Sequence, residues 1–107
     1  MTEIDADALL PNDRVKRAVL DGEITQLTRG AGTRYAAEGD TFELGDEAFR
    51  ITSVTERTLG EFTDADARRE GSESLEAYKA RMKRVHRGEF EWDDTAEVRT
   101  YRFEPAD

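Results

Sequence analysis

Apolar residues recur at helical spacing near the start of the chain, at Val15, Ala18 and Val19. This i, i+3, i+4 pattern is typical of one buried helix face. Asn12 or Asp13 can accept a hydrogen bond from the unpaired N–H groups of the first turn. Gly22 is well placed as the residue past the helix end, because glycine adopts positive φ without steric cost. The pattern predicts a short helix over residues 13–21.

Three strands are predicted farther along the chain, and the last two of them form a hairpin. Residues 24–29 are rich in β-branched side chains and alternate approximately, so they predict a strand whose buried face stays open. Residues 41–44 alternate cleanly, and Gly45-Asp46 suits a two-residue turn into a strand over 48–54. That strand can continue to Thr58, with a bulge.

Two helices and a last strand, over 98–103, are predicted after the hairpin. Thr63 stands three residues before an acid, which is a variant of the capping box, and Gly71 ends a helix over 64–70. Ser74 can cap the second helix. The apolar face of that helix consists of Leu75, Tyr78, Met82 and Val85.

The order of these elements favours an α+β fold with a small, curled, mainly antiparallel sheet. Strands joined by tight turns, with the helices gathered in one insertion, do not fit a parallel βαβ arrangement. The 107 residues fit a single domain over 1–107. Residues 1–10 and 104–107 lack clear periodicity, and we expect them to be flexible ends.

The composition narrows the classes of protein that fit. The net charge of -9 arises from acidic residues scattered along the chain, which favours a salt-adapted acidic surface over a protein that repels nucleic acid. The absence of cysteine excludes disulfides and cysteine zinc sites. No apolar run approaches the ~18–20 residues of a membrane span, and the acidic N-terminus lacks the basic and apolar regions typical of a signal peptide. We expect a cytoplasmic monomer without a metal or a cofactor.

The stretch 22–29 is the first candidate for a site, because a predicted helix ends there and a polar strand begins. Arg29 could bind a phosphate, a carboxylate or a base edge, although from composition alone a surface ion pair is the simpler explanation. Thr25 and Thr28 offer hydroxyls on opposite strand faces, and threonine is also an ordinary strand residue.

Glu70 is the second candidate, since it stands at a helix end where the helix dipole disfavours a negative charge. It could act as a general base or accept a hydrogen bond from an exocyclic amine. The alternative is a solvated acid in an acidic protein.

Five basic residues without an intervening acid form the third candidate: Lys79, Arg81, Lys83, Arg84 and Arg87. They could contact phosphates, or they could simply form a solvated helix face. Aromatic residues that might stack on bases, Tyr35, Trp92 and Tyr101, are not interleaved with this basic run.

Four segments of the chain resemble the ASCH domain family of the PUA-like superfamily. GEITQLTR over 22–29 is similar to a Gly-x-Lys-Thr-x-Thr-x-Arg segment that follows the first helix. Gly39-Asp40 resembles a Gly-Asp before a hairpin, and LGEFTDADARREGSESLEAYK is similar to a Leu-x-x-Leu-Thr segment ending in Glu-Gly-x-Ser-Leu. The terminal VRTYRFE also fits, so the resemblance covers about 15–103.

The resemblance implies a PUA-like small β-barrel with short helices packed around it and a cleft for RNA or modified nucleosides. Some ASCH proteins are amidohydrolases of N4-acetylcytidine that use the lysine, the second threonine and a later glutamate. Gly22, Thr25, Arg29 and Glu70 match the family pattern, whereas Ile24 stands at the lysine position and Leu27 at the second threonine position. Neither isoleucine nor leucine can supply that chemistry. Thr28 is adjacent to Leu27, but a one-residue shift along a strand points to the other face.

The leading hypothesis is therefore a module that binds RNA or a nucleoside. Its cleft would be framed by the 22–29 segment and the 64–70 helix, with ligand contacts from Gly22, Thr25, Arg29, Glu70, Lys79, Lys83 and Arg87. The runner-up is an amidohydrolase acting on an N4-acylated cytidine-type nucleoside with a rearranged site and Glu70 as its catalytic residue. A third hypothesis is a protein-interaction domain that uses the 90–97 loop and has no nucleic-acid role.

Overall fold

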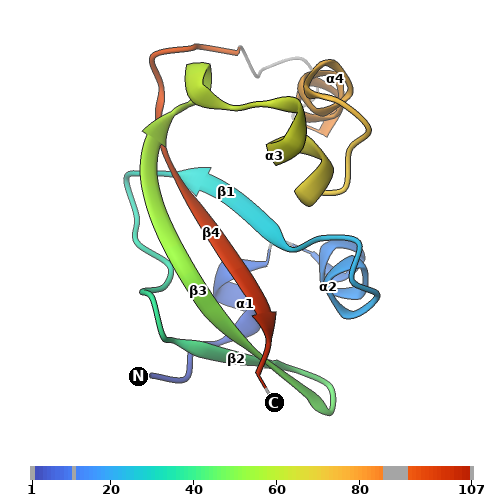
Figure 1. Cartoon of the computed structure of the whole chain (residues 1–107), viewed down its shortest axis with the longest axis vertical. Helices are drawn as coiled ribbons and strands as arrows, with labels where there is room; N and C mark the ends of the chain where they lie inside the picture. The colour runs from blue at the N-terminus through green and yellow to red at the C-terminus, as the bar shows by residue number, and fades with distance from the viewer. Residues whose placement is uncertain (1, 11, 86–91, 107) are drawn as a thin grey trace.

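The computed structural model describes residues 2–10, 12–85 and 92–106 (Figure 1). A 3₁₀ turn, Leu59–Glu61, joins the sheet to the later helices. The elements are α1 (Ala6–Leu9), α2 (Asp13–Leu20), β1 (Gln26–Gly30), β2 (Thr41–Leu44), β3 (Glu47–Thr58), α3 (Asp64–Arg69), α4 (Leu75–Val85) and β4 (Glu97–Pro105).

The strands form one antiparallel sheet in the order β1-β4-β3-β2. The long central strands β3 and β4 bend together, so the sheet curls into a half-barrel (Figure 1). A register shift between Ile51 and Ser53 marks the predicted bulge, and bulges increase local bending. Gly45 takes a φ of 60° in the β2–β3 turn, as that turn requires. The prediction of an α+β fold with a curled antiparallel sheet is confirmed.

The helix ends follow the local signals in the sequence. The Asn12 side chain accepts a hydrogen bond from the N–H of Val15 at 2.9 Å and caps α2. Thr63 and Asp66 form a reciprocal capping box at the start of α3. Gly71 follows α3 with a φ of 88°, which turns the chain toward α4.

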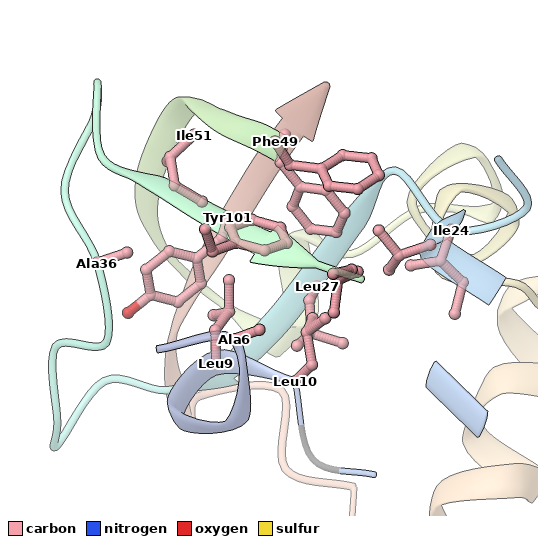
Figure 2. Close-up of a cluster of buried hydrophobic side chains, with 13 residues drawn as sticks. Ala6, Leu9, Leu10, Ile24, Leu27, Ala36, Phe49, Ile51 and Tyr101 are labelled. Carbon is pink, nitrogen blue, oxygen red and sulfur yellow. The ribbon is translucent and has the colours of Figure 1, made fainter. Parts of the chain in front are cut away.

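The main core lies on one face of the sheet, beneath α1 and α2. Tyr101 is central to this core, and Leu9 and Leu10 of the N-terminal segment pack against the sheet residues (Figure 2). Phe42 stacks on Phe49 with ring centroids 5.4 Å apart. Phe103 meets Phe42 edge-on at 5.6 Å. This cluster contains most of the large buried side chains among the described residues.

The N-terminal residues are part of the fold, contrary to the expectation of a flexible end over 1–10. Leu9 and Leu10 are only 0% and 1% exposed. The N–H of Ile4 donates to the carbonyl of Thr41, and that of Thr41 donates to the carbonyl of Thr2. These bonds add a short parallel bridge to β2. A four-residue helix is too short to show periodicity in the sequence, which explains the wrong expectation.

The C-terminal residues also differ from the expectation of flexibility over 104–107. β4 runs to Pro105, and Glu104 pairs with Arg50 across the sheet. The N–H of Ala106 donates to the carbonyl of Ala48 at 2.9 Å. Residue 107 lies outside the described residues.

On the other face of the sheet, α3 lies over β1, and α4 packs against α3 (Figure 1). These helices share a small aromatic cluster in which Phe62 stacks on Tyr78 at 4.7 Å and Trp92 meets both rings edge-on. The layer between these helices and the sheet is polar rather than apolar. Among the described residues, no helix is long and apolar enough to cross a membrane.

The packing of α1 can be tested by truncating Leu9. We expect Leu9→Ala to lower the free energy of unfolding by about 3 kcal/mol, because the deletion leaves a cavity beneath the sheet. Leu20→Ala is the matched control: Leu20 is 41% exposed, so its truncation should cost less than about 0.5 kcal/mol. Urea unfolding of both variants is the measurement. Equal losses would show that α1 is not part of the core.

Candidate functional site

The strand β1 sends alternate side chains to the two faces of the sheet. Gln26 and Thr28 face α3, which lies over this strand (Figure 1). Leu27 belongs to the main core, and Arg29 reaches the α1 side. Both faces of this segment therefore pack against other parts of the fold. One face contacts apolar residues, and the other contacts polar residues.

Glu70 is the centre of the polar layer. It caps the end of α3 and is only 1% exposed. Its carboxylate accepts hydrogen bonds from the Thr28 hydroxyl at 2.6 Å and the Thr28 N–H at 3.1 Å. Gln26 Nε2 donates to it at 2.9 Å, and the Tyr78 hydroxyl donates at 3.0 Å. Both carboxylate oxygens are therefore occupied by two donors each.

Asp66 is the second buried carboxylate, one helical turn before Glu70. Arg57 contacts it twice: Nη1 donates to Oδ2 at 3.1 Å, and Nη2 lies 3.0 Å from Oδ1 as an ion pair without hydrogen-bond alignment. Arg69 Nη1 and Gln26 Nε2 donate to Oδ1 at 3.3 Å and 3.2 Å. Thr63 supplies its N–H and its hydroxyl, each at 2.9 Å.

These residues close a ring of hydrogen bonds. Arg57 Nε donates to the Thr100 hydroxyl at 3.0 Å, and the Thr100 and Thr28 hydroxyls are 2.9 Å apart. Arginine can only donate, so the Thr100 oxygen accepts from Arg57 and its own proton points to Thr28. Thr28 then donates to Glu70, and Gln26 connects Glu70 to Asp66. The ring returns to Arg57 through Asp66.

The two carboxylates have pKa values shifted in opposite directions. Burial raises the pKa of Glu70, and its neutral donors do not offset the loss of water. Burial alone would also raise the pKa of Asp66, but hydrogen bonds from Arg57, Thr63 and Gln26 outweigh it and hold that pKa well below its ordinary value. Burial and the neighbouring Glu70 carboxylate raise the pKa of Tyr78, which keeps its hydroxyl a donor.

Thr28 faces Glu70, whereas Leu27, at the position of the second threonine in the ASCH pattern, faces the main core. The expectation that Thr28 points away from the candidate site is wrong, because β1 turns its even-numbered residues toward α3. A hydroxyl 2.6 Å from a buried carboxylate has the contact of a nucleophile with its base. Ile24 and Leu27 are both buried in the main core, so neither contributes polar chemistry.

Thr25 lies close to Glu70, at the edge of the polar layer. Its N–H donates to the carbonyl of Arg69 at 2.8 Å, and its own carbonyl accepts from the N–H of Phe103 at 3.2 Å. The Thr25 side chain is exposed. Gly22, three residues earlier, is exposed and has a φ of 79° after α2, so its role is to turn the chain into β1.

Arg29 does not share a cleft with Glu70. Its Nη1 donates to the carbonyl of Leu9 at 2.7 Å, and its guanidinium lies 4.4 Å from the ring centre of Tyr35. The Tyr35 N–H in turn donates to the hydroxyl of Tyr101. Arg29 therefore fastens α1 and the following loop to the core, on the opposite face of the sheet from Glu70.

The basic residues of α4 lie on different sides of that helix, and Arg81 contacts the polar layer. Arg81 bonds the carbonyl of Glu70 at 3.0 Å, whereas Lys79 lies over the Trp92 ring at 4.8 Å. At 100° per residue, Lys79 and Lys83 are on the side of the helix away from Arg81. Arg87 lies outside the described residues, as do positions 90 and 91 of the 90–97 loop.

Gln26, Asp66, Arg57 and Thr100 were not candidates from the sequence. Asp66 alone carried a signal, since it is the acid three residues after Thr63 and was assigned only to the capping box. Gln26 begins β1 and is fully buried, at 0% exposure, and a buried amide requires polar partners, but the sequence does not display that burial. The pairing of Arg57 and Thr100 depends on register between distant strands, which the sequence does not display.

A shallow pocket of about 280 Å³ lies at the far end of β3 and β4, and Arg57 of the ring is part of its lining. Glu56 and Arg99 face each other at 3.0 Å in its lining, and Arg99 also donates to the carbonyl of Ala31. Glu56 and Arg99 thus neutralise each other, and Arg57 pairs with Asp66. Within the described residues, no group of three histidine, aspartate or glutamate side chains could hold a metal ion.

Three solved structures have the same arrangement of elements. An ASCH domain from Lactobacillus crispatus superposes with a TM-score of 0.67 at 18% identity, over 97% of this chain and 79% of that one. The chain has an ASCH-type, PUA-like fold. Protein EF3133 of Enterococcus faecalis, from the family DUF984, gives 0.66 at 15% identity over 99% and 76%, and the hypothetical protein PH0355 gives 0.62 at 16% over 98% of both chains.

The resemblance to ASCH domains is thus confirmed at the level of the fold. No protein-family model matches the sequence, and no curated protein sequence matches it significantly. In this ASCH-type fold the ring of hydrogen bonds joins β1, β3 and β4 to α3, and the exposed residues around it form the candidate site.

The raised pKa of Glu70 makes the stability of the folded state depend on pH. The folded state holds the Glu70 proton more tightly than the unfolded state does, so this group favours folding at low pH and loses that contribution as pH rises above about its ordinary 4.5. Relative to Glu70→Gln, the wild type should lose stability with rising pH, with a slope of at most about 1.4 kcal/mol per pH unit.

Urea unfolding of both proteins across a pH series measures this difference. Glu43→Gln is the matched control, because Glu43 is exposed and its replacement should leave the pH profile parallel to that of the wild type. Parallel profiles for Glu70→Gln and the wild type would contradict the raised pKa.

Proposed function

We propose that this chain is an ASCH-type module that binds RNA or a nucleoside over β1 and the end of α3. The observation that carries the proposal is the saturation of Glu70: four donors occupy its carboxylate, and it is 1% exposed. A group held in this way is suited to orient its neighbours rather than to take a proton from a ligand.

The residues available to a ligand are those at the rim of the layer. Thr25 is exposed, and its hydroxyl has no hydrogen-bond partner among the described residues. Thr28 is half-buried, and its hydroxyl faces Glu70. Glu70 and Gln26 act as positioning residues, since they fix Thr28 and the end of α3 in place. The resemblance to ASCH domains supports RNA or a modified nucleoside as the ligand class.

A titration with short single-stranded RNAs, cytidine and N4-acetylcytidine tests the proposal. In molar salt, phosphate-driven binding is strongly weakened, so binding that persists rests on stacking and hydrogen bonds. Thr25→Val should weaken binding by about tenfold, because it removes an exposed hydroxyl without changing shape. Thr33→Val, in an exposed loop, and Arg29→Met, on the opposite face, should leave binding unchanged. The proposal would be refuted if neither the RNAs nor the nucleosides bound.

The 2.6 Å contact between Thr28 and Glu70 favours a second candidate, an amidohydrolase of an N4-acylated cytidine-type nucleoside. In that case the Thr28 hydroxyl would attack the amide carbonyl while Glu70 accepts its proton. The amide C–N bond would then break as Glu70 returns the proton to the leaving N4 amine, and water would hydrolyse the acyl ester on Thr28 to a free carboxylic acid. The raised pKa of Glu70 makes the carboxylate a better base than an exposed one. The rearranged site would use Thr28 where the family pattern has the position of Leu27.

This candidate is tested by measuring, with chromatography, the release of cytidine from N4-acetylcytidine. Turnover by the wild type should be lost in Thr28→Val by at least about a hundredfold, and in Glu70→Gln to a similar extent. Thr25→Val should retain the rate at saturating substrate, because Thr25 does not contact Glu70. A wild type without turnover would leave binding as the function, and full activity in Thr28→Val would exclude this nucleophile.

A further inference from the structure

Four arginines surround the buried carboxylates of the polar layer. Arg57 and Arg69 contact Asp66, Arg81 bonds the carbonyl of Glu70, and Arg102 Nε donates to Gln26 Oε1 at 3.1 Å. The two acids are buried and committed to inward hydrogen bonds. In a chain with a net charge of -9, this rim is locally positive.

Two of these arginines have donors to spare. Arg102 is exposed and uses only Nε, so neither of its terminal nitrogens has a partner among the described residues. The Arg69 side chain is 38% exposed and uses only Nη1. A guanidinium held by one nitrogen presents its remaining N–H groups in a planar fork, which matches the geometry of phosphate oxygens.

The backbone of Thr25 brings these two side chains to one place. Its N–H bonds the carbonyl of Arg69, and its carbonyl accepts from Phe103, the neighbour of Arg102. Gln26, the next residue, contacts Asp66 on the Arg69 side and Arg102 on the other. Gln26 thus holds Arg102 directly and is linked to Arg69 through Asp66, and the exposed Thr25 precedes Gln26 in the chain.

We propose that Arg69, Arg102 and Thr25 form a phosphate-binding lip, so that the ligand of this site is a nucleotide or a phosphorylated RNA end rather than a free nucleoside. This inference rests on the proposed function and specifies its ligand class. It also moves the phosphate contact from Lys79 and Lys83 of α4 to residues of α3 and β4.

Calorimetric titrations with cytidine, cytidine 5′-monophosphate, the dinucleoside monophosphate CpC and inorganic phosphate test the inference at low and at molar salt. The monophosphate should bind about tenfold more tightly than cytidine at low salt, and molar salt should remove most of that advantage. CpC binding as tightly as the monophosphate would identify the phosphodiester of RNA as the source; weaker CpC binding would identify a terminal phosphate.

Arg102→Gln and Arg69→Gln should each abolish the preference for the monophosphate, measured as the ratio of the affinities for the monophosphate and for cytidine in the same variant. Arg34→Gln is the matched control, since Arg34 is exposed in the loop after β1 and makes no contact among the described residues. Arg102→Lys keeps the charge but not the fork, and it should retain only part of the preference. Circular dichroism verifies that each variant folds.

Three results would overturn the inference. Equal affinities for cytidine and its monophosphate would reject the phosphate lip while the binding function stands. An affinity for inorganic phosphate equal to that for the monophosphate would show that the nucleoside contributes nothing. A preference that survives in Arg102→Gln and Arg69→Gln but disappears in Lys79→Gln would place the phosphate on α4. If no compound binds, both this inference and the proposed function fail.

Discussion

Two carboxylates sealed between a sheet and a pair of helices are tolerated only because donors from both layers converge on them. Asp66 is stabilised by the positive charge of Arg57, and Glu70 by neutral donors alone. Hydrogen bonds depend on direction as well as distance, so this layer allows α3 little freedom to slide or rotate over β1. An apolar layer of the same size would permit several packings of similar energy. The placement of every residue at the site depends on this constraint.

The ring also explains why the most promising residue in the sequence is not the most accessible one. Glu70 is used up in fixing Gln26 and Thr28, and the chemistry available to a ligand passes to the side chains that these residues support. Gln26 has a double role, since its amide nitrogen serves the acids and its amide oxygen holds Arg102. The site is therefore built by an interior network and presented by a rim. Loss of one interior member would disturb several rim positions together.

Local signals in the sequence were sufficient for most of the elements. The caps at Asn12 and Thr63 and the turn at Gly45 act over three or four residues, so the sequence displays them directly. Long-range pairings were not predictable in this way. The role of Thr28 depends on which face of β1 meets α3, and an approximate alternation cannot decide that. Arg29 matched a family pattern, yet its partner is a backbone carbonyl in α1, an element too short to be recognised from periodicity.

The parallel bridge between Glu3 and Thr41 has a consequence for the behaviour of the protein at high concentration. β2 is an outer strand, and an outer strand exposes N–H and carbonyl groups that can pair with a second molecule. The residues before α1 occupy both backbone groups of Thr41 and lie along that edge. A segment that resembles a loose tail in the sequence thus protects the sheet from edge-to-edge aggregation. Removal of the residues before and within α1 would leave β2 free to pair with a second molecule and would also weaken the core.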